Sequence, residues 1–166
     1  MASKKGIAVT GIILAAITGA SFLSWVIPQD NETTFVVSDY EGYLDGIKSI
    51  HEILEESINI EYQNLLNGKI TPQEYITITE VTSSQITAKI SEFVTTKPSE
   101  EWVASYINYM EALKKFNSYI TETKVLANLI ENDDSQEKID EVIQKIELLK
   151  NESSEFVRIS NESRPG

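Results

Sequence analysis

The sequence predicts an all-α protein in which a single N-terminal transmembrane helix precedes an extracytoplasmic antiparallel four-helix bundle. Three observations lead to this fold class. Residues 6–27 contain no charged side chain. Four later stretches carry apolar residues at the alternating three- and four-residue spacing of amphipathic helices. These stretches begin or end at capping residues, proline or glycine.

The N-terminal run GIAVTGIILAAITGASFLSWVI is long enough to cross a bilayer. Its 22 residues reach roughly 33 Å as a helix, against a hydrocarbon layer of about 30 Å. Lys4 and Lys5 precede the run, and lysines beside a span stay on the cytoplasmic side. We therefore expect a single-pass protein of the cell membrane, with its N-terminus in the cytoplasm and residues 28–166 outside it.

A cleaved signal peptide is the alternative explanation of the same run. Secretory signals have an apolar stretch of roughly 7–15 residues followed by a cleavage site with small residues. Here the apolar stretch continues past Ala20, where a cut would fall, and Thr18 fits poorly at the third position before that cut. Trp25 matches the aromatic residues of the outer membrane interface, and Pro28 ends the helix beyond it. We expect an uncut anchor.

One face of the predicted span carries small residues four positions apart: Gly11, Ala15 and Gly19. Such rows let helices approach closely in lipid, where close packing drives association. The span is therefore expected to bind another membrane helix. Integral membrane protein subunits are the expected partners, and membrane lipid surrounds residues 6–27.

Composition excludes several classes of function. Lys4 and Lys5 are two of the 14 basic residues, and all 26 acidic residues lie at or after Asp30, so the part beyond the predicted span has a net charge of −14. This charge argues against nucleic acid as a partner and against adhesion to an anionic membrane surface. The chain has no cysteine, which excludes disulfides, thiolate catalysis and cysteine-ligated metal sites.

We divide the chain into an anchor, a linker, a helical bundle domain and a flexible tail, which are residues 1–28, 29–37, 38–160 and 161–166. Four helices joined by short turns pack most economically as an up-down-up-down bundle, because each short connection returns the next helix along its predecessor. Two helical hairpins packed less regularly on a partner would also fit these patterns.

The first two bundle helices have clear start signals. We expect Ser38 to cap the first, with Glu41 at the capping-box spacing, and Thr71-Pro72 to begin the second, with Glu74 returning to the cap. The buried stripe expected for the first helix, widened by Tyr43 and Ile50, is Tyr40, Leu44, Ile47, His51, Leu54 and Ile58. The stripe of the second has small residues in its middle and consists of Ile76, Thr79, Ser83, Ile86, Ile90 and Phe93.

The third helix has the longest stripe. It starts after Lys97-Pro98, and a turn at residues 132–134 separates it from the fourth helix, which Ser135 caps and which frays from Arg158. A second row on the third helix is expected to widen its buried face: Val103, Ile107 and Met110. The main stripe consists of Trp102, Tyr106, Tyr109, Leu113, Phe116, Ile120, Thr123, Ala127 and Ile130. That of the fourth helix consists of Ile139, Val142, Ile146, Leu149, Ser153 and Phe156.

No arrangement of residues indicates a catalytic, metal or cofactor site. His51 is the one histidine and shares a helix face with Glu55. A di-iron bundle needs Glu-x-x-His on each of two helices, and the second is missing. A satisfied or surface-rim histidine is the simpler interpretation. We therefore expect no enzyme activity and no cofactor.

Aromatic residues and glycosylation triplets supply the remaining candidates. Aromatic side chains with polar tips are common interface anchors, with burial in the core as the alternative, and the candidates here are Tyr40, Tyr43 and Trp102. Three Asn-x-Ser/Thr triplets mark candidate glycosylation sites at Asn31, Asn151 and Asn161.

The stretch KKGIAVTGIILAAITGASFLSWVIPQDNETTF looks like the anchors of small membrane proteins of ammonia-oxidising archaea. Over the full chain, one N-terminal span followed by an acidic, cysteine-free helical domain resembles the small helical accessory subunits proposed for the archaeal ammonia monooxygenase complex. The resemblance implies a non-catalytic role, with copper held by the large subunits. One histidine, no cysteine and two methionines offer no copper-ligating cluster in this chain.

From these features we expect a structural or assembly subunit of a membrane protein complex. The alternative is an extracytoplasmic ligand-binding or sensory bundle that acts through a partner. Such a bundle would use a pocket near Trp102, Tyr106 and Tyr109.

Overall fold

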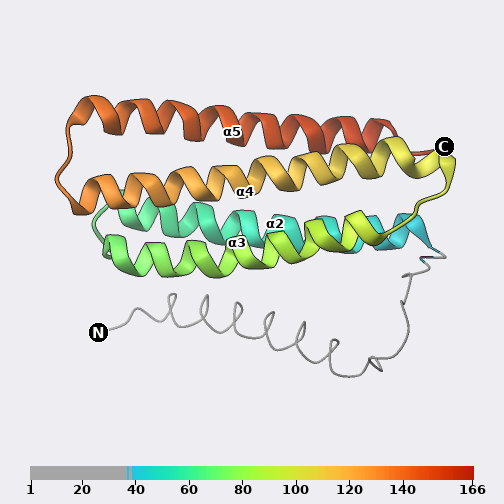
Figure 1. Ribbon diagram of the computed structural model, residues 1–166, viewed down its shortest axis with the longest axis horizontal. Coiled ribbons are helices and arrows are strands. Elements are labelled where there is room, and N and C mark those ends of the chain that lie inside the picture. Colours follow the sequence, from blue (N-terminus) through green and yellow to red (C-terminus); the bar gives the residue numbers. More distant parts are fainter. Residues whose placement is uncertain (1–36, 38) are drawn as a thin grey trace, which may run out of the picture. The chain divides into compact units, whose positions relative to one another are not determined.

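The computed structural model describes Val37 and residues 39–166, and these form an antiparallel bundle of helices (Figure 1). A one-turn 3-10 helix, Glu100–Trp102, precedes the third long helix. The long helices are α2 (Tyr40–Leu66), α3 (Pro72–Thr95), α4 (Val103–Glu131) and α5 (Gln136–Glu162). Within this part of the chain there is no strand, so the prediction of an all-α helical bundle is confirmed for it.

The predicted span and its packing face lie outside the described residues, and so does Asn31. The span is residues 6–27, and its packing face consists of Gly11, Ala15 and Gly19. Among the residues that are described, no helix is long and apolar enough to cross a membrane.

Local hydrogen bonds explain where α2 and α3 begin. At the start of α3, Thr71 and Glu74 form the predicted capping box: the Glu74 amide donates to Thr71 Oγ1 (3.2 Å) and the Thr71 amide donates to Glu74 Oε2 (2.8 Å). In α2 the predicted cap was wrong by one residue. Asp39 is the N-cap, and its Oδ1 accepts from the Gly42 amide (2.9 Å). Gly68, at φ +64°, reverses the chain after α2.

The end of α5 differs from the prediction. The helix does not fray at Arg158 but continues to Glu162. Arg158 forms ion pairs with Glu155 and Glu162 at helical spacing, which supports the last turns. Beyond the helix, Arg164 reaches Asp45 of α2 (2.7 Å), so the segment assigned to a flexible tail makes a contact across the bundle.

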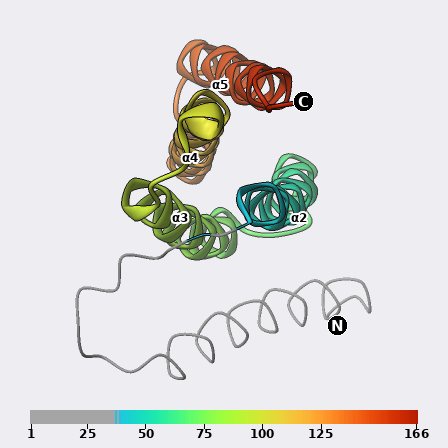
Figure 2. The same cartoon turned by 90° about the vertical axis from the view of Figure 1, so that its right-hand side faces the viewer.

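Helix α4 is the centre of the bundle and lies between α5 and α3 (Figure 2). The middle of its predicted stripe, from Tyr106 to Ala127, is buried as expected. The predicted second row was wrong at Val103 and Ile107, which are 37 % and 51 % exposed, whereas Met110 is half-buried and packs against the core. The flank that α4 buries instead carries residues at a spacing of seven: Ser105, Ala112, Tyr119 and Leu126.

This flank pairs with an equally spaced row on α5, and we call the two rows the α4–α5 seam. Ser105 Oγ donates to the Ser160 carbonyl (2.9 Å), Ser160 Oγ donates to the Ser105 carbonyl (2.8 Å), and Ser153 Oγ donates to the Ala112 carbonyl (3.0 Å). Continuing the same antiparallel register places Tyr119 opposite Ile146. The α5 row is Ile139, Ile146, Ser153 and Ser160.

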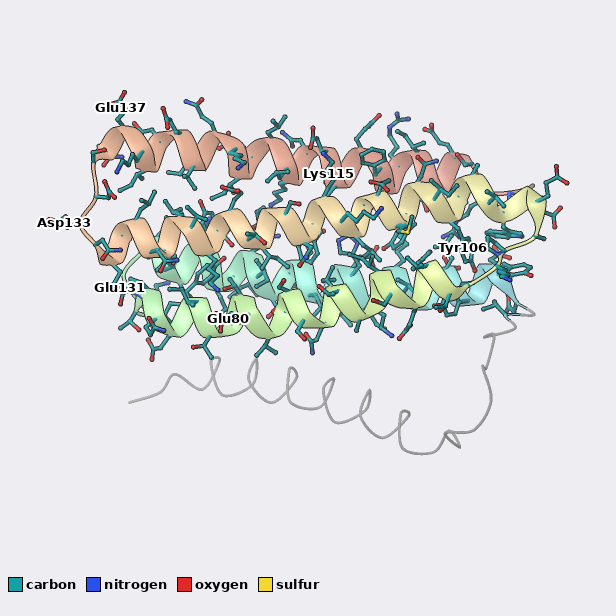
Figure 3. The ribbon with its side chains drawn as sticks, in the orientation of Figure 1. Glu80, Tyr106, Lys115, Glu131, Asp133 and Glu137 are labelled. Atoms are coloured by element: carbon teal, nitrogen blue, oxygen red, sulfur yellow. The ribbon has the colours of Figure 1, made fainter. Side chains whose placement is uncertain are left out.

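Small side chains at one end of the seam bring the two backbones within reach of serine hydroxyls. These hydroxyls are buried, and each donates to a main-chain carbonyl of the facing helix. Lys115, which Figure 3 places between the two helices, pairs with Glu152 (2.7 Å), and Lys145 pairs with Glu122 (2.6 Å). The seam therefore combines close packing, buried hydrogen bonds and flanking ion pairs.

Helix α2 is held differently. It lies beside α3 and is set apart from α5 (Figure 2). Its buried stripe agrees with the prediction at Leu44, Ile47, His51, Leu54 and Ile58, but the expected widening by Ile50 was wrong, because that side chain is exposed. Side-chain contacts bridge α2 and α5, such as Lys150 Nζ donating to Asn59 Oδ1 (3.1 Å). The space between these two helices holds the cavity described below.

The seam predicts opposite outcomes for two adjacent serines of α5. Ser153→Leu inserts a large side chain against Ala112, and we expect it to lower the free energy of unfolding by about 1–3 kcal/mol through overpacking. The matched control Ser154→Leu changes an exposed serine and should stay within about 0.5 kcal/mol of the parent. Urea unfolding followed by circular dichroism measures both, and equal destabilisation by the two variants would contradict the seam.

Candidate functional site

A buried histidine–tyrosine pair lies between α2 and α4. His51 is 3 % exposed, and its Nδ1 lies 3.0 Å from the Tyr109 hydroxyl oxygen. The two rings meet edge to face with centroids 5.9 Å apart, and the Phe116 ring packs against the imidazole at 4.7 Å. Periodicity along α2 explains the burial, because His51 occupies the stripe that also buries Ile47 and Leu54. The sequence-based interpretation of His51 as a core histidine agrees with this position.

Hydrogen-bond accounting assigns the tautomer of His51. Among the described residues, Tyr109 Oη has one hydrogen-bond partner, His51 Nδ1, so the phenolic hydrogen is satisfied when it donates there. The neutral imidazole then carries its proton on Nε2. That atom is buried and has no partner among the described residues. The pair therefore offers one unused buried donor.

A cavity of about 150 Å³ adjoins this pair at the α2–α5 gap, and we call it the His51 cavity. Its wall includes charged side chains of α2 and hydroxyl groups of α5. The lining residues are Lys48, His51, Glu52, Glu55, Tyr109, Ser153, Ser154 and Val157. A cavity with these groups can take a small polar molecule.

Burial perturbs both members of the pair. It lowers the pKa of His51 to about 4, because the charged imidazolium loses its hydration. Burial also raises the pKa of the Tyr109 hydroxyl, with a further contribution from the Glu52 and Glu55 carboxylates. Both side chains are therefore neutral at pH 7.

The side of α2 that faces away from the His51 cavity carries exposed apolar residues, which we call the α2 outer stripe. Ile50, Ile53 and Ile60 are 39 %, 52 % and 42 % exposed. Together with Gly46 and Ser57 they follow a four-three-four-three spacing, so they share one helix face. A helix of this kind is apolar on two sides, one buried in the bundle and one open.

The face of α2 between the His51 cavity and this stripe carries acidic residues without ion pairs. Helix α2 carries six carboxylates and one lysine, and within the described part of the chain only Asp45 of the six has an ion-pair partner. The three glutamates Glu52, Glu55 and Glu56 line a shallow, open groove of about 630 Å³ along α2, which we call the α2 groove. The groove also contains Asn59, Ile60, Gln63 and Asn64. Together, stripe and groove form an acidic surface with an apolar edge.

The predicted interface aromatics gather at one end of the bundle. Trp102 is buried, and Tyr40 and Tyr43 are half-buried. All three surround Tyr106, whose hydroxyl donates to the Tyr40 carbonyl (2.8 Å) and which Figure 3 shows at the end where α4 begins. The three side chains close the core there. Trp102 and Tyr106 line neither the His51 cavity nor the α2 groove, and Tyr109 lines the cavity.

Two candidate glycosylation sites lie within α5. Asn151 is exposed and Asn161 is half-buried. In the first triplet the hydroxyl residue, Ser153, is buried against Ala112, so the folded chain conceals part of the recognition triplet. Modification of Asn151 would therefore have to precede folding of α5.

Ile50 was assigned to the buried stripe of α2, and Ile53 and Ile60 were missed, although their spacing was available in the sequence. The three isoleucines repeat at helical intervals on a face beside the buried stripe. The His51 cavity could not be found that way, because it depends on the distance between α2 and α5. No set of three or more histidine, aspartate or glutamate side chains in the described region is arranged to hold a metal ion.

Comparison of the chain with protein-family models, curated proteins and solved structures returns no match.

The buried imidazole predicts an acid-dependent loss of stability. The pKa of His51 is about 4 in the folded chain and 6.5 when unfolded, so between these values the unfolded state binds the proton first. Its stabilising contribution is complete above pH 6.5 and is lost as pH falls through 4. That loss amounts to about 3 kcal/mol relative to His51→Gln, measured by urea unfolding from pH 7 to 4.

The variant retains every carboxylate of the parent, including Glu52 and Glu55 in the cavity wall, so the difference between the two stability curves isolates the contribution of His51. Titration of the imidazole by NMR supplies an independent value for its pKa. Parallel stability curves for parent and variant, or an imidazole that titrates near 6.5, would contradict the burial of His51.

Proposed function

We propose that this protein is a non-catalytic structural or assembly subunit of a membrane protein complex. The observation that carries the proposal is the exposed α2 outer stripe, which meets the acidic α2 groove at Ile60. Large exposed aliphatic side chains gathered on one helix face are typical of protein interaction sites. A subunit that holds a complex together needs such a face.

The distribution of ion pairs supports this assignment of α2. The described carboxylates of the other helices include many with a lysine or arginine partner, such as Glu80 with Lys124 (2.6 Å) and Glu111 with Lys114 (2.7 Å). In α2, Glu52, Glu55 and Glu56 have none within the described region. Exposed ion pairs contribute little to stability, so their absence costs the fold little and leaves the charges for a partner.

The N-terminal sequence supplies the membrane part of the proposal. Residues 6–27 are uncharged and long enough to cross a bilayer, and Gly11, Ala15 and Gly19 offer a face for a neighbouring membrane helix. We place the bundle outside the cytoplasm on the basis of Lys4 and Lys5. The resemblance of the chain's layout makes an ammonia monooxygenase the proposed complex, with copper chemistry in other subunits.

Purification of the full chain from native membranes in mild detergent tests this function. We expect partner subunits in fixed stoichiometry with the chain, and we expect protease added to intact cells to remove the bundle. A monomer recovered under several gentle conditions would contradict the assembly role. Protection of the bundle from protease in intact cells would contradict the proposed location.

A ligand-binding or sensory bundle is the second candidate, and the His51 cavity favours it. The cavity is lined by His51 and Tyr109 on one side and by the serines Ser153 and Ser154 of α5 on the other. Its volume of about 150 Å³ limits a ligand to a few non-hydrogen atoms. Glu52 and Glu55 in the wall oppose an anion and Lys48 opposes a cation, so the lining indicates a small neutral polar molecule.

Thermal-shift screening of the full chain with small amides, alcohols and ketones separates the two candidates. A ligand that raises the melting temperature of the parent but not of His51→Leu would support the sensory function. For the assembly subunit we expect no stabilisation by any of these molecules. His51→Leu places an apolar side chain in the core. The melting temperature of this variant without ligand is the baseline for the shifts measured with it.

A further inference from the structure

Helices α2 and α4 end in the same backbone conformation, each at an asparagine. Asn67 follows α2 with φ −89° and ψ 5°, and Asn132 follows α4 with φ −91° and ψ 5°. The next residue is left-handed in both cases, Gly68 at φ +64° and Asp133 at φ +51°. Both asparagines are exposed, and the two turns lie at the same end of the bundle (Figure 1). The two caps therefore share a backbone and differ in the residue after the asparagine.

Two hydrogen bonds hold the Asn67–Gly68 pair at the end of α2, and we call this arrangement the α2 cap. Asn67 Nδ2 donates to the Gln63 carbonyl (2.6 Å), and the Gly68 amide donates to the Leu65 carbonyl (2.9 Å). At ψ 5° the Gly68 nitrogen eclipses the main-chain nitrogen of Asn67 and not its Cβ. The closed cap therefore holds the Gly68 nitrogen away from the side-chain amide of Asn67.

The reaction open to an Asn-Gly pair is deamidation. The Gly68 nitrogen gives up its proton, and its electron pair forms a bond to Asn67 Cγ. The Cγ–Nδ2 bond breaks, and Nδ2 leaves with a proton as ammonia, which gives a five-membered cyclic imide. Water then adds to one of the two imide carbonyls. Cleavage of the bond between Cγ and the Gly68 nitrogen gives aspartate, and cleavage of the original main-chain bond gives isoaspartate.

We infer that Asn67 is a site of spontaneous deamidation whose rate is controlled by opening of the α2 cap. Helix ends open locally at a much lower free-energy cost than the core does. Opening breaks the two hydrogen bonds and lets ψ of Asn67 rotate until the Gly68 nitrogen reaches Cγ. Glycine has no Cβ, so nothing crowds this approach.

Asp133 protects the matching asparagine. Asn132 Nδ2 donates to the Asn128 carbonyl (2.7 Å), and the Asp133 amide donates to the Ile130 carbonyl (3.3 Å), so this cap must open in the same way. The attack itself differs, because the Cβ of Asp133 crowds the nitrogen and its carboxylate opposes loss of the amide proton. Asp133 is labelled in Figure 3. Asn132 therefore serves as an internal control for Asn67.

Deamidation changes the connection between α2 and α3. The side-chain donor to the Gln63 carbonyl is lost, and the new carboxylate lies at the negative end of the α2 dipole. Isoaspartate also adds one carbon to the main chain. This shifts the Lys69 amide, which donates to the Asn64 carbonyl (2.8 Å) in the intact turn. The last turn of α2 is therefore less stable after the reaction.

Ageing of the full chain, purified in mild detergent and held at mildly alkaline pH, tests the inference. Peptide mapping by mass spectrometry should find aspartate and isoaspartate at position 67, formed about tenfold faster than any product at position 132. Urea unfolds both caps, so Asn67 should react faster in urea than in the folded chain.

Two variants exchange the residues that follow the asparagines. Asp133→Gly should make Asn132 react at a rate close to that of Asn67 in the parent. Gly68→Asp should slow the reaction of Asn67 by about tenfold. Aspartate already occupies the left-handed conformation at position 133, so the same residue suits position 68. Circular dichroism melting verifies that both variants remain folded.

Several outcomes would overturn the inference. Absence of product at position 67 in the folded chain, or equal rates at Asn67 and Asn132 in the parent, contradicts the site. Equal rates for Asn67 in the folded chain and in urea contradict control by the α2 cap. Unchanged rates in both variants contradict the role of the following residue. The reaction needs no partner protein, so each of these results leaves the assembly function standing.

Discussion

Close contact between α4 and α5 is the constraint on which the rest of the bundle depends. Serine and alanine side chains let the two backbones approach until buried hydroxyls donate to carbonyls of the facing helix, as Ser105 and Ser160 do for each other. Buried polar groups need partners, so the register of the two helices is specified as well as their distance. With α5 held on one side, α4 presents its aromatic stripe to α2 and α3.

The same arrangement explains why α2 differs from the other helices. Its contacts to the core are made by large side chains, including the imidazole of His51 against Tyr109 and Phe116, and it stays apart from α5. That separation creates the His51 cavity on one side of α2. The side of α2 that faces away from the cavity carries the exposed isoleucines Ile50, Ile53 and Ile60. Both candidate functions thus arise on the helix that is packed least closely.

The helices and most of their buried stripes could be predicted from the sequence, because apolar spacing and capping residues are local signals. Thr71 and Glu74 form the expected capping box, and the stripe from Leu44 to Ile58 is buried as expected. Ser105, Ala112 and Ser160 were missed, since small residues resemble surface positions unless the facing helix is known. Ile50 and Ile107 were assigned to widened core faces because hydrophobicity does not distinguish a core from an interaction surface.

His51 and Ile53 are two positions apart in α2. His51 is buried in the core, and Ile53 is exposed at the surface. Both side chains are fixed to the same helix, so a displacement of α2 at Ile53 would also displace the imidazole. The 3.0 Å separation between His51 Nδ1 and the Tyr109 oxygen therefore depends on the position of α2 relative to α4.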